Sequence, residues 1–461
     1  MEHYCFDINF PEKLIDFVSP NEIDGSHKFH AHLYAKESTI ELHIFFGFNL
    51  QTPEFSSWLY RGKLEKAFAE CVVKNINKEN CTQKIDFSES KINSYSFGGN
   101  QNENGLGEYF KITLSSVRIY RDSSNNKLGS ADFYMNGVGF DLVKYFHSLL
   151  FGNNGEFRIS RMKGLEDFYQ FEYLKFRPEF EFYSSDVRNE TKAFIEKRPK
   201  ISFTFSKESS EKDIIQCAEI VRLLGSFYMH NNIEYNFSRI HLQNSTLLIY
   251  KSKGKEYQQT DLGLHGFGLN WDFHKLMLSD WQNSAKNNFK LLSKIIPLFV
   301  QSMLVDHHSS LLILCNIFEY CMRGFSPEPE KYPLILTEEQ SNKKYEAACN
   351  FFLETIDSKY HKEFLDKWEF QLNKLKTRPE KSKWSEYIKR KSIEVPQIIT
   401  IDKIKKIRDN ITHGSLNKVK ETEIRKANSL MYGITGLLIL QQLNIHEGNL
   451  DRITDSLNKT E

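Results

Sequence analysis

Paired cysteines and long apolar runs are both missing from this chain of 461 residues. Seven cysteines are present, an odd number, and none forms a Cys-x-x-Cys pair. A disulfide framework and a zinc ribbon are therefore not expected, and reduced thiols fit a cytoplasmic protein. The longest apolar stretches, 310–318 and 433–440, are much shorter than the roughly 20 residues of a membrane-spanning helix. Because the first four residues also lack a signal-peptide pattern, we expect a soluble protein with no membrane partner.

An overall excess of either charge is absent as well. The chain has 61 Lys and Arg and 60 Asp and Glu, a net charge of +1, which gives no general attraction to nucleic acid. The segment 374–426 differs, because it has sixteen basic and seven acidic residues, a net charge of +9. A local basic stretch favours a phosphate-bearing partner, although a solvated helix face is the common alternative.

Aromatic residues are abundant, at 14% with 37 Phe, and such residues favour strands and large cores. Alternation of apolar and polar residues predicts strands, or a hairpin in the last case, at 40–44, 110–114, 201–205 and 238–250. Helices are expected at 58–74 and 209–224. We therefore predict a β-rich N-terminal region over 1–280, with one or two subdomains.

The apolar spacing becomes helical from about residue 280. We expect helices at 291–302, 309–323, 338–375, 384–391, 400–412 and 421–443. Pro297 is expected to start, break or kink the first of these, and 377–383 is expected to be a charged break. The prediction is an all-α helical bundle over 281–446 with a polar tail over 447–461. The fold class is therefore α+β.

The segment 401–415, Ile-Asp-Lys-Ile-Lys-Lys-Ile-Arg-Asp-Asn-Ile-Thr-His-Gly-Ser, carries the most information about function. Three isoleucines, from Ile404 to Ile411, have the i, i+3, i+7 spacing of one buried helical face. Gly414 is suited to end the helix. His413 is then expected in the last turn or just beyond it, outside the core.

Arg408 and His413 have the chemistry that RNA cleavage requires. RNA supplies its own nucleophile, the 2′-hydroxyl, so the protein has to move two protons and stabilise a charged phosphorane. Histidine titrates near neutral pH and suits proton transfer, whereas arginine stays charged and binds phosphate through a planar fork. Five helical residues correspond to about 140° of rotation, so Arg408 and His413 do not lie directly above each other. A loosened last turn is needed to bring the guanidinium and the imidazole to one phosphate. No metal or other cofactor is needed in principle.

Neighbouring side chains complete the predicted site. Asp409 or Asn410 can orient the imidazole and fix its tautomer. Five lysines are expected to hold the phosphates on either side of the cleavage point: Lys403, Lys405, Lys406, Lys418 and Lys420.

The heptapeptide 408–414 resembles the Arg-x4-6-His signature of the HEPN superfamily (higher eukaryotes and prokaryotes nucleotide-binding). In that family a polar residue often follows the arginine and a glycine commonly follows the histidine, as in this chain. Upstream, 309–323 is similar to the family's first core helix, with an aromatic–Glu pair at Phe318 and Glu319. The order of the expected helices also fits a HEPN bundle. A β-rich region before a C-terminal HEPN domain resembles the layout of ApeA-type anti-phage proteins.

The resemblance implies a homodimeric endoribonuclease in which two Arg–His motifs form one composite site. Its products would have 2′,3′-cyclic phosphate and 5′-hydroxyl ends. Glu319 would pair with Arg408 across the bundle. The ApeA-type layout implies antiviral defence by abortive infection, in which the N-terminal region senses a phage component or restrains the nuclease. A phage-derived protein would trigger cleavage of host RNA, with tRNA as a candidate.

Two other interpretations stay open. The bundle could be a non-catalytic dimerisation module that carries a β-rich protein- or ligand-binding domain. The run Asp306-His307-His308 could suggest a metal site. Adjacent histidines on a helix point about 100° apart, however, so a surface or interface pair is the expected interpretation.

Overall fold

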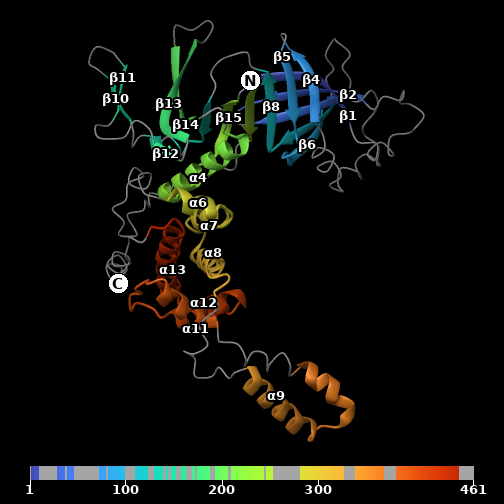
Figure 1. Ribbon diagram of the computed structural model, residues 1–461, viewed down its shortest axis with the longest axis vertical. Coiled ribbons are helices and arrows are strands. Elements are labelled where there is room, and N and C mark those ends of the chain that lie inside the picture. The colour runs from blue at the N-terminus through green and yellow to red at the C-terminus, as the bar shows by residue number, and fades with distance from the viewer. Residues whose placement is uncertain are drawn as a thin grey trace, which may run out of the picture. The chain divides into compact units, whose positions relative to one another are not determined.

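The computed structural model divides into two compact units (Figure 1). The first unit comprises Met1–Asp261 and Trp271–Gln282, and the second comprises Leu262–Asn270 and Asn283–Glu461. The structure describes residues 2–9, 28–36, 39–45, 72–78, 81–98, 109–122, 129–137, 139, 142–143, 147–151, 157–161, 169–171, 174–186, 193–205, 209–242, 245–252, 281–325, 338–367 and 380–445.

The smaller main sheet of the first unit has five strands in the order β1-β2-β3-β7-β6, and all neighbours are antiparallel. Its strands are β1 (Glu2–Asn9), β2 (Lys28–Ala35), β3 (Ile40–Phe45), β7 (Tyr109–Leu114) and β6 (Ile92–Gly98). Buried and half-buried residues alternate along β3, because successive side chains of a strand point to opposite faces. One face of this sheet is therefore buried.

The larger sheet has nine strands in the order β12-β13-β14-β9-β15-β16-β8-β5-β4. Its strands are β12 (Tyr169–Phe171), β13 (Leu174–Asp186), β14 (Ala193–Thr204), β9 (Ser130–Met135), β15 (Tyr235–His241), β16 (Ser245–Lys251), β8 (Ser116–Asp122), β5 (Cys81–Asp86) and β4 (Val72–Lys78). A separate two-stranded ladder joins β10 (His147–Phe151) and β11 (Phe157–Arg161).

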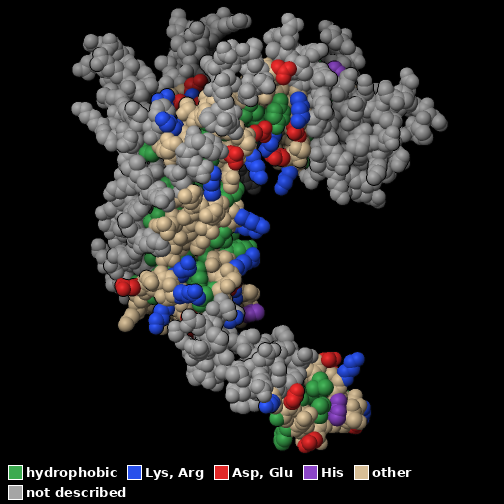
Figure 2. Space-filling view, in the orientation of Figure 1, with side chains coloured by type: hydrophobic (Ala, Val, Ile, Leu, Met, Phe, Trp, Pro, Cys, Tyr) green, Lys and Arg blue, Asp and Glu red, His purple; other side chains and the backbone are tan. Residues whose placement is uncertain are grey.

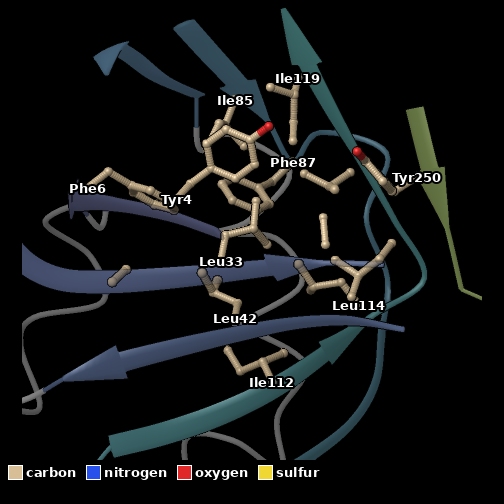
Figure 3. Packing of buried hydrophobic residues seen from close by; sticks show 14 of the residues in the cluster. Tyr4, Phe6, Leu33, Leu42, Ile85, Phe87, Ile112, Leu114, Ile119 and Tyr250 are labelled. Atoms are coloured by element: carbon tan, nitrogen blue, oxygen red, sulfur yellow. The ribbon is translucent and has the colours of Figure 1, made fainter. Parts of the chain in front are cut away.

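The hydrophobic core lies between the two main sheets. Figure 3 shows Leu33, Leu42 and Ile112 of the smaller sheet pointing toward Ile119 and Tyr250 of the larger one. These five side chains are at most 5% exposed. Since burying one large apolar side chain contributes about 1.5–3 kcal/mol, this interface contributes substantially to the stability of the first unit.

The opposite face of the larger sheet carries α4 (Glu211–Met229). The helix begins after Ser210, whose side chain accepts a hydrogen bond from the Asp213 N–H, as expected of an N-cap. The Tyr235 hydroxyl of β15 donates to the Ala218 carbonyl at 2.8 Å, and Arg118 of β8 lies 3.2 Å from Glu211. The larger sheet is therefore packed on both faces.

The sequence-based expectations for this unit are largely confirmed. Residues 40–44 and 110–114 lie in strands, and 238–250 belongs to the antiparallel pair β15–β16. The helix expected at 209–224 forms and continues to Met229. The helix expected at 58–74 is wrong at its end, because residues 72–74 pair with β5 in a strand. Residues 58–71 lie outside the described part of the chain.

The second unit is helical where the structure describes it. Its helices are α6 (Gln282–Asn287), α7 (Phe289–Ser302), α8 (His307–Cys321), α9 (Glu338–Leu353), α11 (Glu380–Arg390), α12 (Ile401–Thr412) and α13 (Glu421–Gln442), with short 3-10 turns η4 (Ser358–Tyr360) and η5 (Leu416–Lys418). Helix α8 is central, since it contacts α7, α12 and α13. The chain is thus an α+β protein with a β-rich N-terminal region.

Three helix expectations need correction. Helix α7 runs through Pro297, so the proline neither starts nor breaks the helix, and Ile296 and Phe299 on either side of it are buried. The long helix expected over 338–375 is interrupted: α9 ends at Leu353, Asp357 caps a short 3-10 turn, and residues 361–367 are helical again. Helix α11 begins at Glu380, inside the stretch that was expected to be a charged break.

No helix among the described residues is both long and apolar enough to cross a membrane. The longest of them, α13, has 22 residues. It packs against α7 and α8, and polar residues such as Arg425 and Asn428 lie along it.

Leu42→Ala is expected to destabilise the first unit by about 2–5 kcal/mol, because it leaves a cavity in the core. Leu42 is 0% exposed. Ser96→Ala, at an exposed position on β6 of the same sheet, is the control and should change stability by less than about 0.5 kcal/mol. Hydrogen exchange of peptides from β3 and β7 measures both effects. Equal protection in the two variants would contradict the assignment of Leu42 to the core.

Candidate functional site

Helix α12 positions the predicted catalytic residues. The Thr400 side chain caps its first turn by accepting from the Lys403 N–H at 3.2 Å. Ile404 and Ile407 are buried, as the periodicity predicts, whereas Ile411 is only half-buried. The apolar side of α12 packs on α8 and α13. This packing sets the rotation of the helix, and therefore the side on which Arg408 lies.

The end of α12 has a fully formed C-terminal cap. The Gly414 N–H donates to the Ile411 carbonyl at 3.1 Å, and the Ser415 N–H donates to the Asn410 carbonyl at 2.8 Å. These two bonds, with Gly414 at a φ of +70°, are the Schellman arrangement. His413 is the C-cap residue, with its side chain exposed. The predicted end of the helix and the predicted place of His413 both agree with this geometry.

Arg408 is held by carboxylates from two helices. Its Nη2 donates to Oε1 of Glu319 on α8, and its Nη1 donates to Oδ1 of the adjacent Asp409 at 3.0 Å. The Arg408 side chain is 24% exposed, so it can still be reached from solvent. The pairing of Arg408 with Glu319, expected from the family resemblance, is therefore present in the structure.

The surroundings of Arg408 keep its charge. Burial lowers the pKa of the guanidinium, but the hydrogen bond that it donates to Asp409 and the charge of Glu319 outweigh that effect and raise the pKa above its ordinary value. Beside it, burial raises the pKa of the Cys315 thiol to about 12. Cys315 is 0% exposed. It is a neutral core residue and not a nucleophile.

The two residues expected to orient the imidazole are placed differently. The Asp409 carboxylate contacts Arg408, and Asn410 is half-buried with its carbonyl in the helix cap. Within the described ranges, the His413 ring forms no side-chain hydrogen bond and no ion pair. Among the described residues, therefore, side chains fix Arg408, whereas none holds the His413 ring.

The five predicted phosphate-binding lysines fall into two groups. Lys403 forms an ion pair with Glu423 on α13, with Nζ 2.6 Å from Oε1, and Lys405 has Nζ 5.8 Å from the centre of the Trp384 ring. Lys406, Lys418 and Lys420 are exposed and have no carboxylate partner in the described part of the chain. Sequence reasoning missed the partners of the first two, because both lie on other helices.

The run Asp306-His307-His308 starts α8. Asp306 is the N-cap residue, and its side chain accepts from the backbone N–H groups of His308 and Ser309. The His307 Nδ1 lies 3.3 Å from the Asn428 side-chain amide. Among the residues that the structure describes, no three His, Cys, Asp or Glu side chains form a metal-binding group. The surface interpretation of these histidines is consistent with this geometry.

The described geometry provides a fixed guanidinium and an exposed imidazole five residues apart at one end of the bundle. Such a pair can bind a phosphate and exchange protons with it. Comparison with known proteins gives no match: no protein-family model matches the chain, and no curated protein or solved structure is significantly similar to it.

Gly414→Ala is expected to destabilise the end of α12 by about 1–2 kcal/mol, because a residue with a Cβ is strained at positive φ. A Cβ at this position would meet no atom within 4 Å, so the cost comes from the backbone alone. Gly414→Asn should cost less, since asparagine tolerates this conformation better. Hydrogen exchange of α12 peptides measures the effect. Equal protection in the alanine variant and the parent protein would contradict it.

Glu319→Gln is expected to destabilise the contact between α8 and α12 by about 1 kcal/mol, the upper range for a partly exposed ion pair. In an Arg408→Gln background the same change should have little effect, because the partner is already gone. Glu346→Gln, at an exposed position on α9, is the matched control. Hydrogen exchange of α12 peptides is measured for the parent protein, the two single variants and the double variant, which together form a double-mutant cycle. Additive effects would show that the two side chains do not interact in solution.

Proposed function

We propose that this protein is a metal-independent endoribonuclease of the HEPN class, with Arg408 and His413 as its catalytic residues. The observation that carries the proposal is the fixed and charged Arg408, held by Glu319 and Asp409, on the same helix end as the exposed His413. Of the two, arginine suits the phosphate and histidine suits the protons.

The proposed reaction is a transesterification within the RNA. The 2′-oxygen attacks the adjacent phosphorus, its proton leaves to a base, and the bond from phosphorus to the 5′-oxygen breaks. The departing 5′-oxygen gains a proton, so the products are a 2′,3′-cyclic phosphate and a 5′-hydroxyl. His413 acts as the base or the acid. Arg408 neutralises the charge that develops on the non-bridging oxygens, where a preorganised cation is most effective.

One imidazole performs one of the two proton transfers at a time, so a second group is required. In the proposed homodimer, the second Arg–His motif supplies it at a composite site. Asn410 lies in the cap that sets the direction of His413 and is proposed as a supporting residue. Exposed Lys406, Lys418 and Lys420 would hold neighbouring phosphates.

The biological role that we propose is anti-phage defence by abortive infection. The β-rich region would sense a phage-derived protein or restrain the nuclease until the protein is sensed. Cleavage of host RNA, with tRNA as the first candidate, would then stop growth. The resemblance to ApeA-type proteins supports this role, as does the division into a β-rich unit and a helical unit.

The second candidate is a non-catalytic dimerisation module that carries a β-rich binding domain. One observation favours it, because an arginine held by two carboxylates is also an effective structural contact between α8 and α12. A purely structural pair would not require the exposed His413 at the adjacent helix end. The two candidates therefore differ in what happens when only His413 is changed.

The decisive experiment is cleavage of total RNA and of purified tRNA by the full-length protein in EDTA. We expect fragments with 2′,3′-cyclic phosphate ends from the parent protein, and at least a hundredfold slower cleavage by His413→Ala, since a proton-transfer residue contributes about 100- to 10,000-fold. His308→Ala, a half-buried histidine of the same unit, is the control and should cleave normally. The assay is repeated with phage-infected lysate, which supplies a trigger if one is required.

Equal cleavage by the parent protein and His413→Ala would refute the assignment of His413. Absence of cleavage even with infected lysate would favour the structural module.

A further inference from the structure

Four cations of the helical unit lie over aromatic rings around the C-terminal end of α8. All four rings belong to α8, to α11 or to the residues just after α8. The pairs, with distances from the cation to the ring centre, are Arg323 over Tyr320 (4.2 Å), Arg390 over Phe325 (5.6 Å), Lys391 over Tyr387 (5.8 Å) and Lys405 over Trp384 (5.8 Å). Such contacts hold a cation in place by about 0.5–1 kcal/mol at exposed sites.

Three of these rings, on Phe325, Trp384 and Tyr387, form a connected group with Phe318. Phe318 of α8 lies 4.7 Å from Trp384 and 5.6 Å from Tyr387, measured between ring centres. Phe325 lies 5.2 Å from Tyr387 in the same way. The Tyr387 hydroxyl also donates to the Cys321 carbonyl at 2.8 Å. Arg390, Lys391 and Lys405, the cations above these three rings, therefore share one rigid support.

The cations of this surface differ from others in the unit in their ion pairing. No carboxylate within the described ranges forms an ion pair with its six cations, which are Arg323, Lys389, Arg390, Lys391, Lys405 and Lys406. Elsewhere in the same unit, Lys403 and Arg425 are paired with Glu423 and Glu421. In Figure 2, Lys and Arg side chains predominate over the part of this unit where α11 and α12 lie. Six cations of one sign make a surface suited to a polyanion.

This surface adjoins the proposed catalytic arginine. Lys405 precedes Arg408 by three residues on α12, which places the two side chains on neighbouring positions of one helix face. Phe318, at the centre of the ring group, precedes Glu319, the partner of Arg408. A strand of RNA bound at Arg408 would therefore meet this surface next.

We propose that these six cations, named here the cation–aromatic surface, bind the phosphate backbone of single-stranded RNA next to the scissile phosphate. The proposal rests on the proposed ribonuclease function. Trp384 and Tyr387 are buried, so these two rings support their cations and do not stack with bases. A guanidinium that lies over a ring keeps its N–H edge available for phosphate oxygens. Binding through this surface is therefore independent of base sequence.

The test measures RNA binding apart from cleavage. The ligand is a fluorescent single-stranded RNA oligonucleotide with 2′-O-methyl groups, which lacks the attacking hydroxyl and cannot be cleaved by the proposed reaction. Full-length protein with Arg323→Gln, Arg390→Gln and Lys391→Gln is compared with the parent protein over a range of salt concentrations. Each phosphate contact on a single strand contributes about 0.7 to the slope of log affinity against log salt. We expect the slope to fall by about 2 in magnitude, and equally for poly(U) and poly(A) sequences.

The matched control removes three charges from exposed positions elsewhere in the same unit, by Lys290→Gln, Lys294→Gln and Lys362→Gln. It should leave the slope within about 0.7 of the parent value. The charge-conserving variants Arg323→Lys and Arg390→Lys should keep the parent slope, and they also show whether the fold tolerates changes at these positions. Arg323, Arg390 and Lys391 are in addition replaced by Gln one at a time, so that one poorly folded variant does not decide the result.

The proposal would be overturned if the triple variant and all three single variants kept the salt slope of the parent protein. It would also be overturned if the slope fell equally in the triple variant of the cation–aromatic surface and in the control variant. A loss confined to one base sequence would overturn the backbone-binding mode. Failure of the ribonuclease proposal gives a different result, because RNA would then bind to this surface without being cleaved in the experiment with unmodified RNA.

Discussion

The ion pair between Arg408 and Glu319 joins two helices whose paired residues are 89 positions apart in the sequence. The proposed site depends on it in two ways. It fixes a long and otherwise flexible side chain, whose immobilisation costs up to about 2 kcal/mol of rotamer entropy, before any phosphate binds. It also ties α12 to α8, the helix that α7 and α13 contact as well. A guanidinium held in advance at a helix end is the element that electrostatic catalysis requires.

The pair is half-exposed, and that determines how it can act. A fully buried ion pair would be shielded from a substrate, and a fully exposed one would hold Arg408 only weakly. With the Arg408 side chain 24% exposed, two N–H groups bind carboxylates and the others remain available to a phosphate. The same principle applies to the neighbouring cations, which aromatic rings support from below while their polar edges face solvent. At this end of the bundle, neighbouring side chains thus hold the cations in place while leaving their N–H groups accessible to a ligand.

Local patterns were reliable wherever one face of an element is buried. The alternation at 40–44 and the hairpin over 238–250 follow directly from side chains that alternate between the core and the other face. Prediction failed where neighbours outside the element decide. Helix α7 continues through Pro297, and several residues around it are buried against other helices. The helical pattern over 338–375 gave no sign that the chain turns at Asp357, since capping competes with helix continuation on the scale of about 1 kcal/mol.

The sequence by itself determined the local geometry of the candidate site. The isoleucine spacing, Thr400 and Gly414 fix where α12 begins and ends, because each acts on groups within about four residues along the chain. It also placed His413 at the exposed end. Only the tertiary structure decided that Glu319 and Asp409 hold Arg408, that Lys403 is neutralised by Glu423, and that Lys405 lies over Trp384. Most of these partners lie on other helices, and which of them meet is set by how buried faces pack, which no local pattern encodes.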